Sequence, residues 1–176
     1  MNPVASEPQG DHDRHDQELR GARLAGFIYG TILVLSVVIA GAQAYPHGPG
    51  HVAVLVAVTA GVFWLAHVYS FALGESVGHQ KHLSVAELRE IGWREWTLVG
   101  AAVPPIAVLV LGAVGVLGDT AAFWGALTIG LVVLAAQGVL FARIERLGPL
   151  ATLVVAAVNV GLGLLLIGLK VLVSHA

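Results

Sequence analysis

The sequence predicts an all-α membrane protein, a polytopic bundle of five transmembrane helices with its N-terminus in the cytoplasm. Of the 176 residues, 57% are hydrophobic and only 11% are charged, whereas a soluble domain carries about 25% charged residues. The apolar residues gather in long runs, and runs of about 18 or more are typical of transmembrane helices. Lys and Arg occupy alternate loops, which indicates a chain that crosses a membrane repeatedly.

Five apolar stretches are each close to the ~20 residues that cross a bilayer core. We expect them at about residues 23–44, 51–74, 96–117, 120–142 and 149–173, within a transmembrane domain of residues 22–176. Backbone groups in lipid must be paired within the protein. The period-2 alternation of barrel strands is absent, so these stretches are predicted to be helices.

The orientation follows from the basic residues. They precede the first stretch (Arg14, Arg20, Arg23), follow the second (Lys81, Arg89, Arg94) and follow the fourth (Arg143, Arg146). The other two loops contain no Lys or Arg. Because basic loops stay in the cytoplasm, we expect a multi-pass inner (plasma) membrane protein with its C-terminus outside. Lys170, near the outer end of the fifth stretch, is expected to snorkel outward.

Residues 1–21 are polar and acidic and are expected to form a flexible cytoplasmic tail. The run Asp11 to Asp16, DHDRHD, contains metal-binding residue types, but a solvated charge run is the favoured interpretation. The first apolar stretch ends in Ala42-Gln43-Ala44, which is similar to a signal-peptidase site. An uncleaved anchor is favoured, because this stretch exceeds the usual apolar region of a signal peptide and follows a polar tail.

Between the second and third stretches, residues 84–95 predict a short interfacial helix. Ser84 followed by Glu87 fits a capping box. The segment mixes apolar with charged residues, and Trp93 and Trp96 suit the headgroup layer.

His67 and Glu75 stand in an apolar run, and ionisable residues in spans are functional candidates by default. On a helix, Ser70 shares a face with His67, and Glu75 follows His67 along the i, i+4, i+8 row. One interpretation is a proton- or cation-handling pair. The other is a histidine that hydrogen-bonds to a neighbouring helix, with Glu75 at the cytoplasmic interface.

Pro104 and Pro105 are expected to break the third stretch near its middle, because two backbone donors are missing there. Broken helices mark transporter sites in some folds and simple kinks in others. The amides of Gln137 and Asn159 need partners in lipid and are expected to bond across the bundle. Gly26 and Gly30 form a small-xxx-small face on which another helix can pack closely.

Enzymatic chemistry is not predicted. The chain has no cysteine, and it contains no HExxH, GxSxG or Walker motif and no paired carboxylates within a span. Ser70 beside His67 lacks an orienting carboxylate. We therefore expect no catalytic residues, no metal, no cofactor and no nucleic-acid partner. The expected partners are the lipid bilayer and other copies of the chain in a homo-oligomer.

Two short motifs carry a partial resemblance. Arg23 and Phe27 in the first stretch and Trp64 with His67 in the second resemble a bacterial and lysosomal cation-channel family, whose first helix begins Arg-x3-Phe-Ser-Asp. Ile28 and Tyr29 stand where that family has Ser and Asp. Over its full length the chain is more similar to a family of small bacterial integral membrane proteins, a likeness that implies no activity.

Two function classes follow. In the first, a small cation or proton channel or transporter, His67 handles protons or cations, Glu75 forms the cytoplasmic mouth, and the Pro104-Pro105 break lines the cavity; Ser70, Gln137 and Asn159 are the further transport candidates. In the second, a non-enzymatic scaffold or accessory subunit acts by helix association. Convergence of His67, Gln137 and Asn159 on a wet interior would favour transport, and a dry, mutually bonded cluster would favour association.

Overall fold

The structure is a computed structural model that describes residues 9–79 and 84–174, with side chains for residues 26–74, 76, 84–165, 167 and 168. All elements in this part are helices, which confirms the predicted all-α class. They are α1 Gln9–Ala44, α2 Pro49–His79, α3 Val85–Arg94, α4 Thr97–Gly100, α5 Val103–Ala113, α6 Asp119–Ile144 and α7 Pro149–Ser174.

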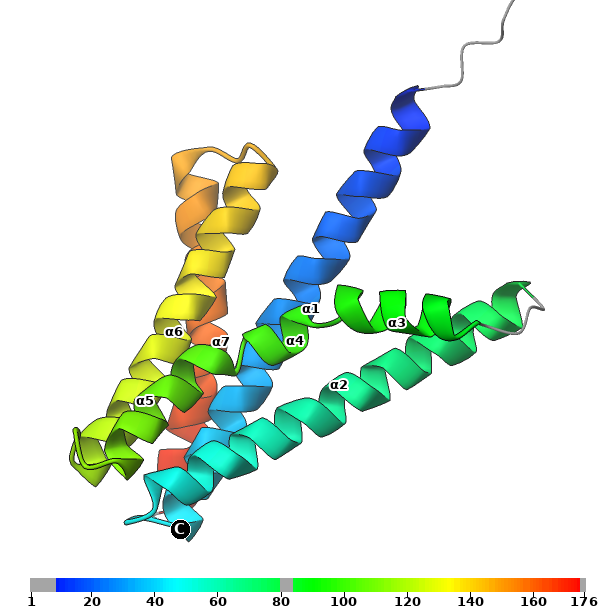
Figure 1. Cartoon of the computed structure of the whole chain (residues 1–176). Coiled ribbons are helices and arrows are strands. Elements are labelled where there is room, and N and C mark those ends of the chain that lie inside the picture. Colours follow the sequence, from blue (N-terminus) through cyan, green and yellow to red (C-terminus); the bar gives the residue numbers. More distant parts are fainter. Residues whose placement is uncertain (1–8, 80–83, 175–176) are drawn as a thin grey trace, which may run out of the picture.

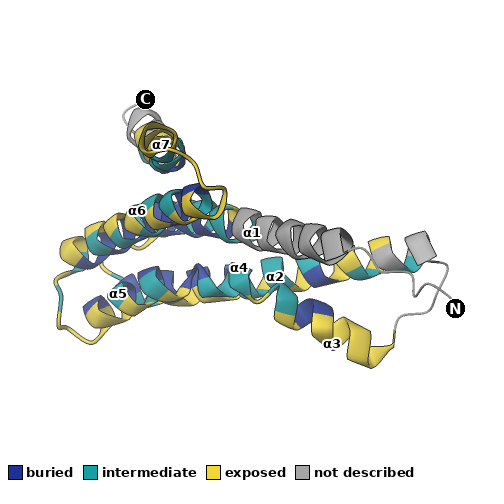
Figure 2. Cartoon of the chain, turned by 90° about the horizontal axis from the view of Figure 1, so that it is seen from above, coloured by how far each residue is buried: buried dark blue, intermediate teal, exposed yellow. Residues whose placement is uncertain are grey.

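Helix α6 is central to the bundle (Figure 1), since it packs against α5, α7 and α1. Helix α2 packs against α1 and α5 and carries α3 along its C-terminal part. Figure 2 shows the resulting layers: α1 and α6 form one row, α2 with α4 and α5 forms a second, and α7 lies on the outer side of the first. Consecutive long helices are antiparallel, so α1 begins at the end of the bundle where α2 and α6 finish.

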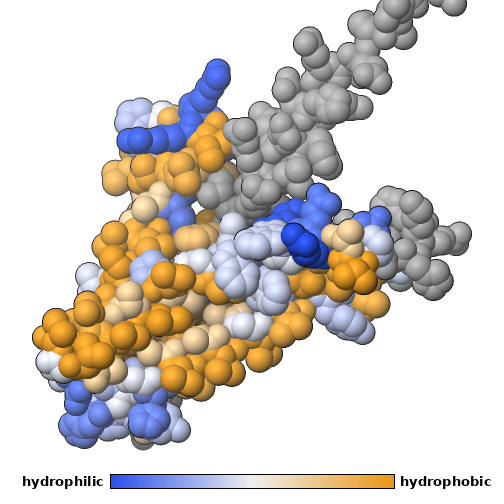
Figure 3. All heavy atoms as spheres, viewed as in Figure 1, coloured by the Kyte–Doolittle hydropathy of each residue, from blue (hydrophilic) through white to orange (hydrophobic). Residues whose placement is uncertain are grey.

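The core lies between these rows and is built from aliphatic side chains. Leu35 of α1, Leu109 of α5 and Leu134 of α6 are fully buried, together with Val38 and Val52. Apolar side chains also cover much of the outer face over α2, α5 and α6, with hydrophilic residues gathered at the ends and over α3 (Figure 3). This distribution is typical of a protein whose outer surface contacts lipid, because water is not the solvent there.

Three helical segments in the described part are long and apolar enough to cross a membrane, namely Gly26–Ala44, Pro49–Gly74 and Asp119–Ile144. The segments Val85–Gly100 and Val103–Ala113 pass the same test as a pair bent by 53°, which gives up to four spans. In α7 the apolar segment Pro149–Leu165 is shorter. These lengths and compositions indicate a membrane protein.

The break predicted at the two prolines is confirmed. Helix α4 ends at Gly100 and α5 begins at Val103, so Pro104 and Pro105 lie in the first turn of α5. Backbone N–H groups in the first turn of a helix have no acceptor within that helix. Proline, which lacks this N–H, is therefore tolerated there without the loss of a helical hydrogen bond. The two prolines therefore mark the start of α5. Pro105 is fully buried.

The N-terminal boundary differs from the prediction. Helix α1 begins at Gln9, inside the stretch that was expected to be a flexible tail, and residues 1–8 lie outside the described part. Gln17, Glu18, Leu19 and Arg20 have high helix propensity. Since the adjacent apolar helix supplies the nucleus, extension adds hydrogen bonds without a second nucleation cost. The DHDRHD run falls in this extension, and its side chains are outside the described part.

Candidate functional site

His67 lies on α2 against the C-terminal end of α3. Its Nε2 is 3.8 Å from Oε2 of Glu95, and the exposed fractions of the two side chains are 38% and 12%. Arg94 Nε lies 3.5 Å from Oε1 of the same carboxylate. The Arg94 guanidinium also lies 5.0 Å from the Phe71 ring centroid, and that ring is 5.7 Å from the imidazole. We call these four residues the His67 cluster.

Local sequence places α3 beside α2. The predicted capping box is confirmed, because the Glu87 N–H donates to Ser84 Oγ at 3.3 Å and the Ser84 N–H donates to Glu87 Oε2 at 2.7 Å. Near the other end of α3, the indole N–H of Trp64 donates to the Gly92 carbonyl at 3.0 Å. This bond joins the two helices one turn before His67, so the residues that follow Gly92 are held over α2.

The carboxylate that the structure describes beside His67 is therefore that of Glu95, and the predicted pairing of His67 with Glu75 stays a prediction. Glu75 lies eight residues farther along α2, about 12 Å at 1.5 Å per residue. Its side chain is outside the described part. Ser70, the third member of the predicted group, donates its hydroxyl to the Ala66 carbonyl at 2.9 Å, within its own helix.

The depth of the His67 cluster follows from its neighbours. The ring centroids of Tyr29 and Phe63 are 6.2 Å apart, which places these residues at one level of the α1–α2 pair. His67 lies four residues beyond Phe63, about 6 Å toward the end of the bundle that carries the arginines. Arg23 lies six residues from Tyr29 in the same direction, about 9 Å. His67 is therefore within about one helical turn of the level of Arg23.

The two predicted span amides lie elsewhere. Gln137 of α6 donates from Nε2 to Thr31 Oγ1 of α1 at 3.3 Å, and the Thr31 hydroxyl donates to the Phe27 carbonyl at 2.9 Å. Asn159 of α7 donates to the Leu134 carbonyl of α6 at 3.4 Å. The expectation that these amides bond across the bundle is confirmed.

These polar groups are buried: Gln137 is 5% exposed, Asn159 7% and Thr31 0%. Among buried side-chain atoms of the described residues, Gln137 Oε1 has no hydrogen-bond partner. We call Thr31, Gln137 and Asn159 the buried amide group. Gln137 and Asn159 thus lie in the α1–α6–α7 packing, whereas His67 lies on α2 against α3.

The two glycines of the first span differ in role. A Cβ on Gly30 would lie 3.1 Å from the Leu98 carbonyl oxygen and 3.4 Å from the Ala101 Cβ, so this glycine allows α4 to approach α1 closely. A Cβ on Gly26 would meet no described atom within 4 Å. Of these two glycines, only Gly30 therefore lies at a close contact between helices in the part of the chain that the structure describes.

A cavity of about 520 Å³ opens between α2 and α3, and we call it the α2–α3 groove. Trp64, Leu65 and Val68 line it from α2, and Val85, Leu88 and Arg89 line it from α3. Trp93 and Trp96 complete the wall, with the Trp96 ring edge-on to Trp64 at a centroid distance of 5.6 Å.

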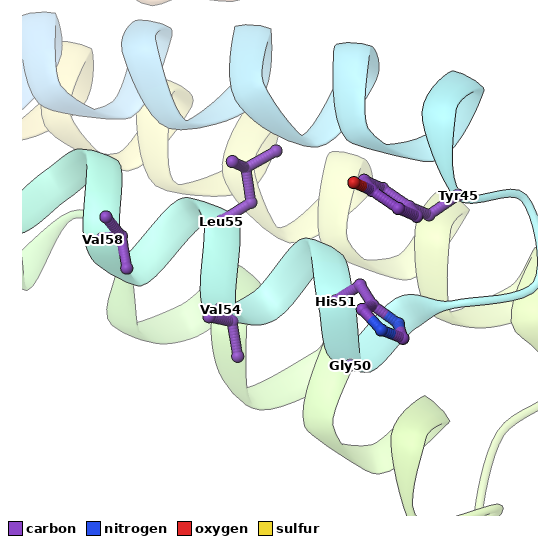
Figure 4. A pocket seen from close by; sticks show the side chains of 6 residues that line it. All are labelled: Tyr45, Gly50, His51, Val54, Leu55 and Val58. Atoms are coloured by element: carbon purple, nitrogen blue, oxygen red, sulfur yellow. The ribbon is translucent and has the colours of Figure 1, made fainter.

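A second cavity, of about 450 Å³, lies at the opposite end of the bundle beside the start of α2. Tyr45 and His51 stack at one end of it with centroids 5.4 Å apart, and Val54, Leu55 and Val58 continue along the helix (Figure 4). Nearby in sequence, His47 Nδ1 lies 3.3 Å from Asp119 Oδ2. Apart from these polar groups at its rim, the cavity is aliphatic.

In chemical terms, the His67 cluster combines an imidazole with a carboxylate, a guanidinium and an aromatic ring. No group of three His, Asp or Glu side chains suited to a metal ion occurs among the residues that the structure describes. A nucleophile with an activating base is not formed by Ser70, because its hydrogen bond goes to a backbone carbonyl.

Sequence reasoning missed Glu95 as the partner of His67 and Thr31 as the partner of Gln137. A signal existed for Glu95, since it lies at the end of the predicted interfacial helix, which was expected on the same side of the membrane as the C-terminal end of the stretch that contains His67. Thr31 gave no such signal, because a threonine in a span ordinarily bonds its own helix.

No protein-family model, no curated protein and no solved structure matches this chain.

Proposed function

We propose that this chain is a five-span protein of the inner (plasma) membrane, with its N-terminus in the cytoplasm and its C-terminus outside. Helix α7, Pro149–Ser174, supplies the fifth span, and the bent pair Val85–Gly100 and Val103–Ala113 contains the third one. Arg23, Arg94 and Arg143 belong to the same end of the bundle, because α1 begins where α2 and α6 finish. Basic residues favour the cytoplasmic side, which supports this orientation.

Within the membrane, the role that the geometry favours is association, as a non-enzymatic scaffold or accessory subunit that forms homo-oligomers. The observation that carries this proposal is the separation of the polar groups. The buried amide group is bonded between α1, α6 and α7, and His67 lies apart on α2 against α3. A conducting copy would need these groups along one hydrated path.

Close helix packing supports the same conclusion. A Cβ on Gly130 would lie 2.6 Å from Leu35 Cδ2, and one on Gly163 would lie 2.6 Å from Leu131 Cδ2. Side chains therefore fill the space between α1, α6 and α7 on both sides of α6. Such an interior has little room for a row of ions or water molecules.

Transport of protons or cations is the second candidate, and the His67 cluster favours it. The imidazole is 38% exposed beside a carboxylate, an arrangement in which a proton can exchange with water. In this alternative an oligomer forms the path, Glu75 stands at its cytoplasmic mouth, and the break at Pro104 and Pro105 lines it.

A flux assay separates the two candidates. Purified protein in liposomes is assayed for proton and potassium flux at about pH 5.5 and about pH 7.5, on either side of the ordinary histidine range. Association predicts no flux above that of empty liposomes for wild type, His67→Ala or Ser70→Ala. Flux that His67→Ala abolishes and Ser70→Ala retains would overturn association and establish transport.

Self-association has its own measurement. A single cysteine at the exposed residue Leu147, labelled with one dye in a chain that has no other cysteine, allows copies to be counted by photobleaching in dilute bilayers. We expect most spots to bleach in two or more steps. The control is a dimeric membrane protein labelled with the same efficiency, which should bleach in two steps. Single-step bleaching of all spots of this chain under the same conditions would contradict a homo-oligomer.

A further inference from the structure

The α2–α3 groove has a fixed wall. The Trp64 indole is bonded to the Gly92 carbonyl at 3.0 Å and packs edge-on against Trp96. Gly92 is buried, and a Cβ at this position would already lie 3.3 Å from Trp64 Cζ2. Contacts within the chain therefore hold the aromatic wall of the groove in place, without any bound molecule.

The charges of α3 are sorted around the helix. At 100° per residue, Arg89 lies on the same face of α3 as Val85 and Gly92, whereas Glu87 and Glu90 are turned at least about 100° away from Arg89. Arg94 is turned away as well, and it is engaged by Glu95 and Phe71. Among the described residues that line the groove, Arg89 alone carries a charge. The groove is therefore apolar with one positive charge.

The groove also lies at a particular depth. It begins at Trp64, one residue beyond Phe63, which contacts Tyr29, and it extends along the amphipathic helix α3 toward the basic end of the bundle. Tryptophan is enriched at the boundary between headgroups and acyl chains, and three of the four tryptophans of the chain line this groove. An occupant would thus reach from the hydrocarbon layer to the headgroup layer.

We propose that the α2–α3 groove is a specific site for one anionic phospholipid. An acyl chain lies against Leu65, Val68 and the tryptophan rings, and the phosphate binds Arg89, whose planar guanidinium can donate two parallel hydrogen bonds. The cavity of about 520 Å³ falls within the range of about 300–1,000 Å³ found for ligand pockets. That the lipid belongs to the cytoplasmic leaflet rests on the proposed orientation, and binding itself does not.

Tryptophan fluorescence tests the site directly. The full chain carrying Trp124→Phe retains only the three groove tryptophans. In detergent micelles, brominated phosphatidylglycerol should quench their fluorescence saturably, at a mole fraction at least about fivefold lower than brominated phosphatidylcholine. Unbrominated phosphatidylglycerol should restore the fluorescence by competition.

Variants identify the charge. Arg89→Gln should remove the preference for phosphatidylglycerol, and Arg89→Lys should retain part of it because the charge remains. Arg143→Gln is the matched control, since Arg143 is an exposed arginine at the same end of the bundle on α6. Circular dichroism should give the same helix content for all of them, because both positions are exposed.

Three results would overturn the proposal. Equal, unsaturable quenching by both lipids would mean that the groove contacts bulk lipid only. Saturable quenching that is the same in wild type and in Arg89→Gln would show that Arg89 does not bind the lipid phosphate. Quenching that appears only when the protein is diluted would mean that a second copy of the chain occupies the groove, because dilution separates the copies and lets lipid enter. None depends on the flux assay, so this proposal and the association proposal can fail separately.

Discussion

His67 illustrates how a single residue in an apolar run takes its meaning from a neighbour that is distant in sequence. The imidazole lies 3.8 Å from the Glu95 carboxylate, and the side chain is 38% exposed. Along the helix axes, His67 is within about one turn of the level of Arg23. In the proposed topology polar headgroups and water are close at that depth, so an ionisable residue is far less costly there than at the bilayer centre. Its presence in FWLAHVYSFALGE therefore has a structural reason in the docking of α3.

Gln137 provides a prediction at the same scale. Its Nε2 bonds Thr31, while its Oε1 is buried without a partner among the described residues. A hydrogen bond between membrane helices contributes about 0.6 kcal/mol on average, and an unpaired buried acceptor costs about 1–3 kcal/mol. We expect Gln137→Leu to leave the free energy of unfolding in detergent unchanged or to raise it by about 1 kcal/mol.

Thr31 does not lose its own bond in this variant, because its hydroxyl donates to the Phe27 carbonyl. Gln137→Ala is the matched control: it removes the same amide but leaves a cavity, so it should be destabilising by about 1–3 kcal/mol. Thermal unfolding followed by circular dichroism measures both. A large loss of stability in Gln137→Leu would show that Oε1 has a polar partner in the folded protein.

At the scale of elements, the pairing of α6 with α7 depends on a close approach of their backbones at Gly138. A Cβ there would lie 2.7 Å from the Ala156 Cα, 3.1 Å from the Ala156 nitrogen and 3.0 Å from the Asn159 Nδ2. Backbone atoms cannot turn aside as a flexible side chain can. The two helices can therefore pack in this way only when residue 138 lacks a side chain.

We expect Gly138→Ala to lower the free energy of unfolding by about 1–3 kcal/mol, as overpacking does in tightly packed interiors. Gly161→Ala, on α7 where a Cβ would meet no described atom within 4 Å, should be neutral or stabilising by up to about 1 kcal/mol through helix propensity. Unfolding of the two variants in the same detergent checks the contrast. Equal stabilities would refute the close contact at Gly138.

The whole molecule is a set of antiparallel helices whose arginines belong to one end of the bundle, whereas Lys170 lies near the C-terminal end of α7. The proposed topology depends on this asymmetry. In the proposed topology, helix α7 decides between four spans and five. If it crosses the membrane, its two ends are on opposite sides, so Leu147 and Ser174 lie in different compartments.

The absence of native cysteine makes this prediction simple to check. In intact cells, a membrane-impermeant maleimide should label Gly118→Cys and Ser174→Cys but not Leu147→Cys until the membrane is opened. The proposed orientation places Gly118, between α5 and α6, outside and Leu147, between α6 and α7, inside. Labelling of Gly118→Cys but not of Ser174→Cys would mean that α7 does not cross.

Much of the architecture was determined by the sequence itself, because its causes are local. Apolar runs in a chain that must pair its own backbone predict helices, Ser84 and Glu87 predict the start of α3, and two adjacent prolines predict the break before α5. Only the tertiary structure decided the partners of the polar side chains. Thr31 and Gln137 are 106 residues apart in sequence, and His67 lies beside Glu95 of the segment that follows α3. Such pairs depend on how each helix is rotated and placed against its neighbours, and this follows from packing across the bundle, which no local pattern of residues specifies.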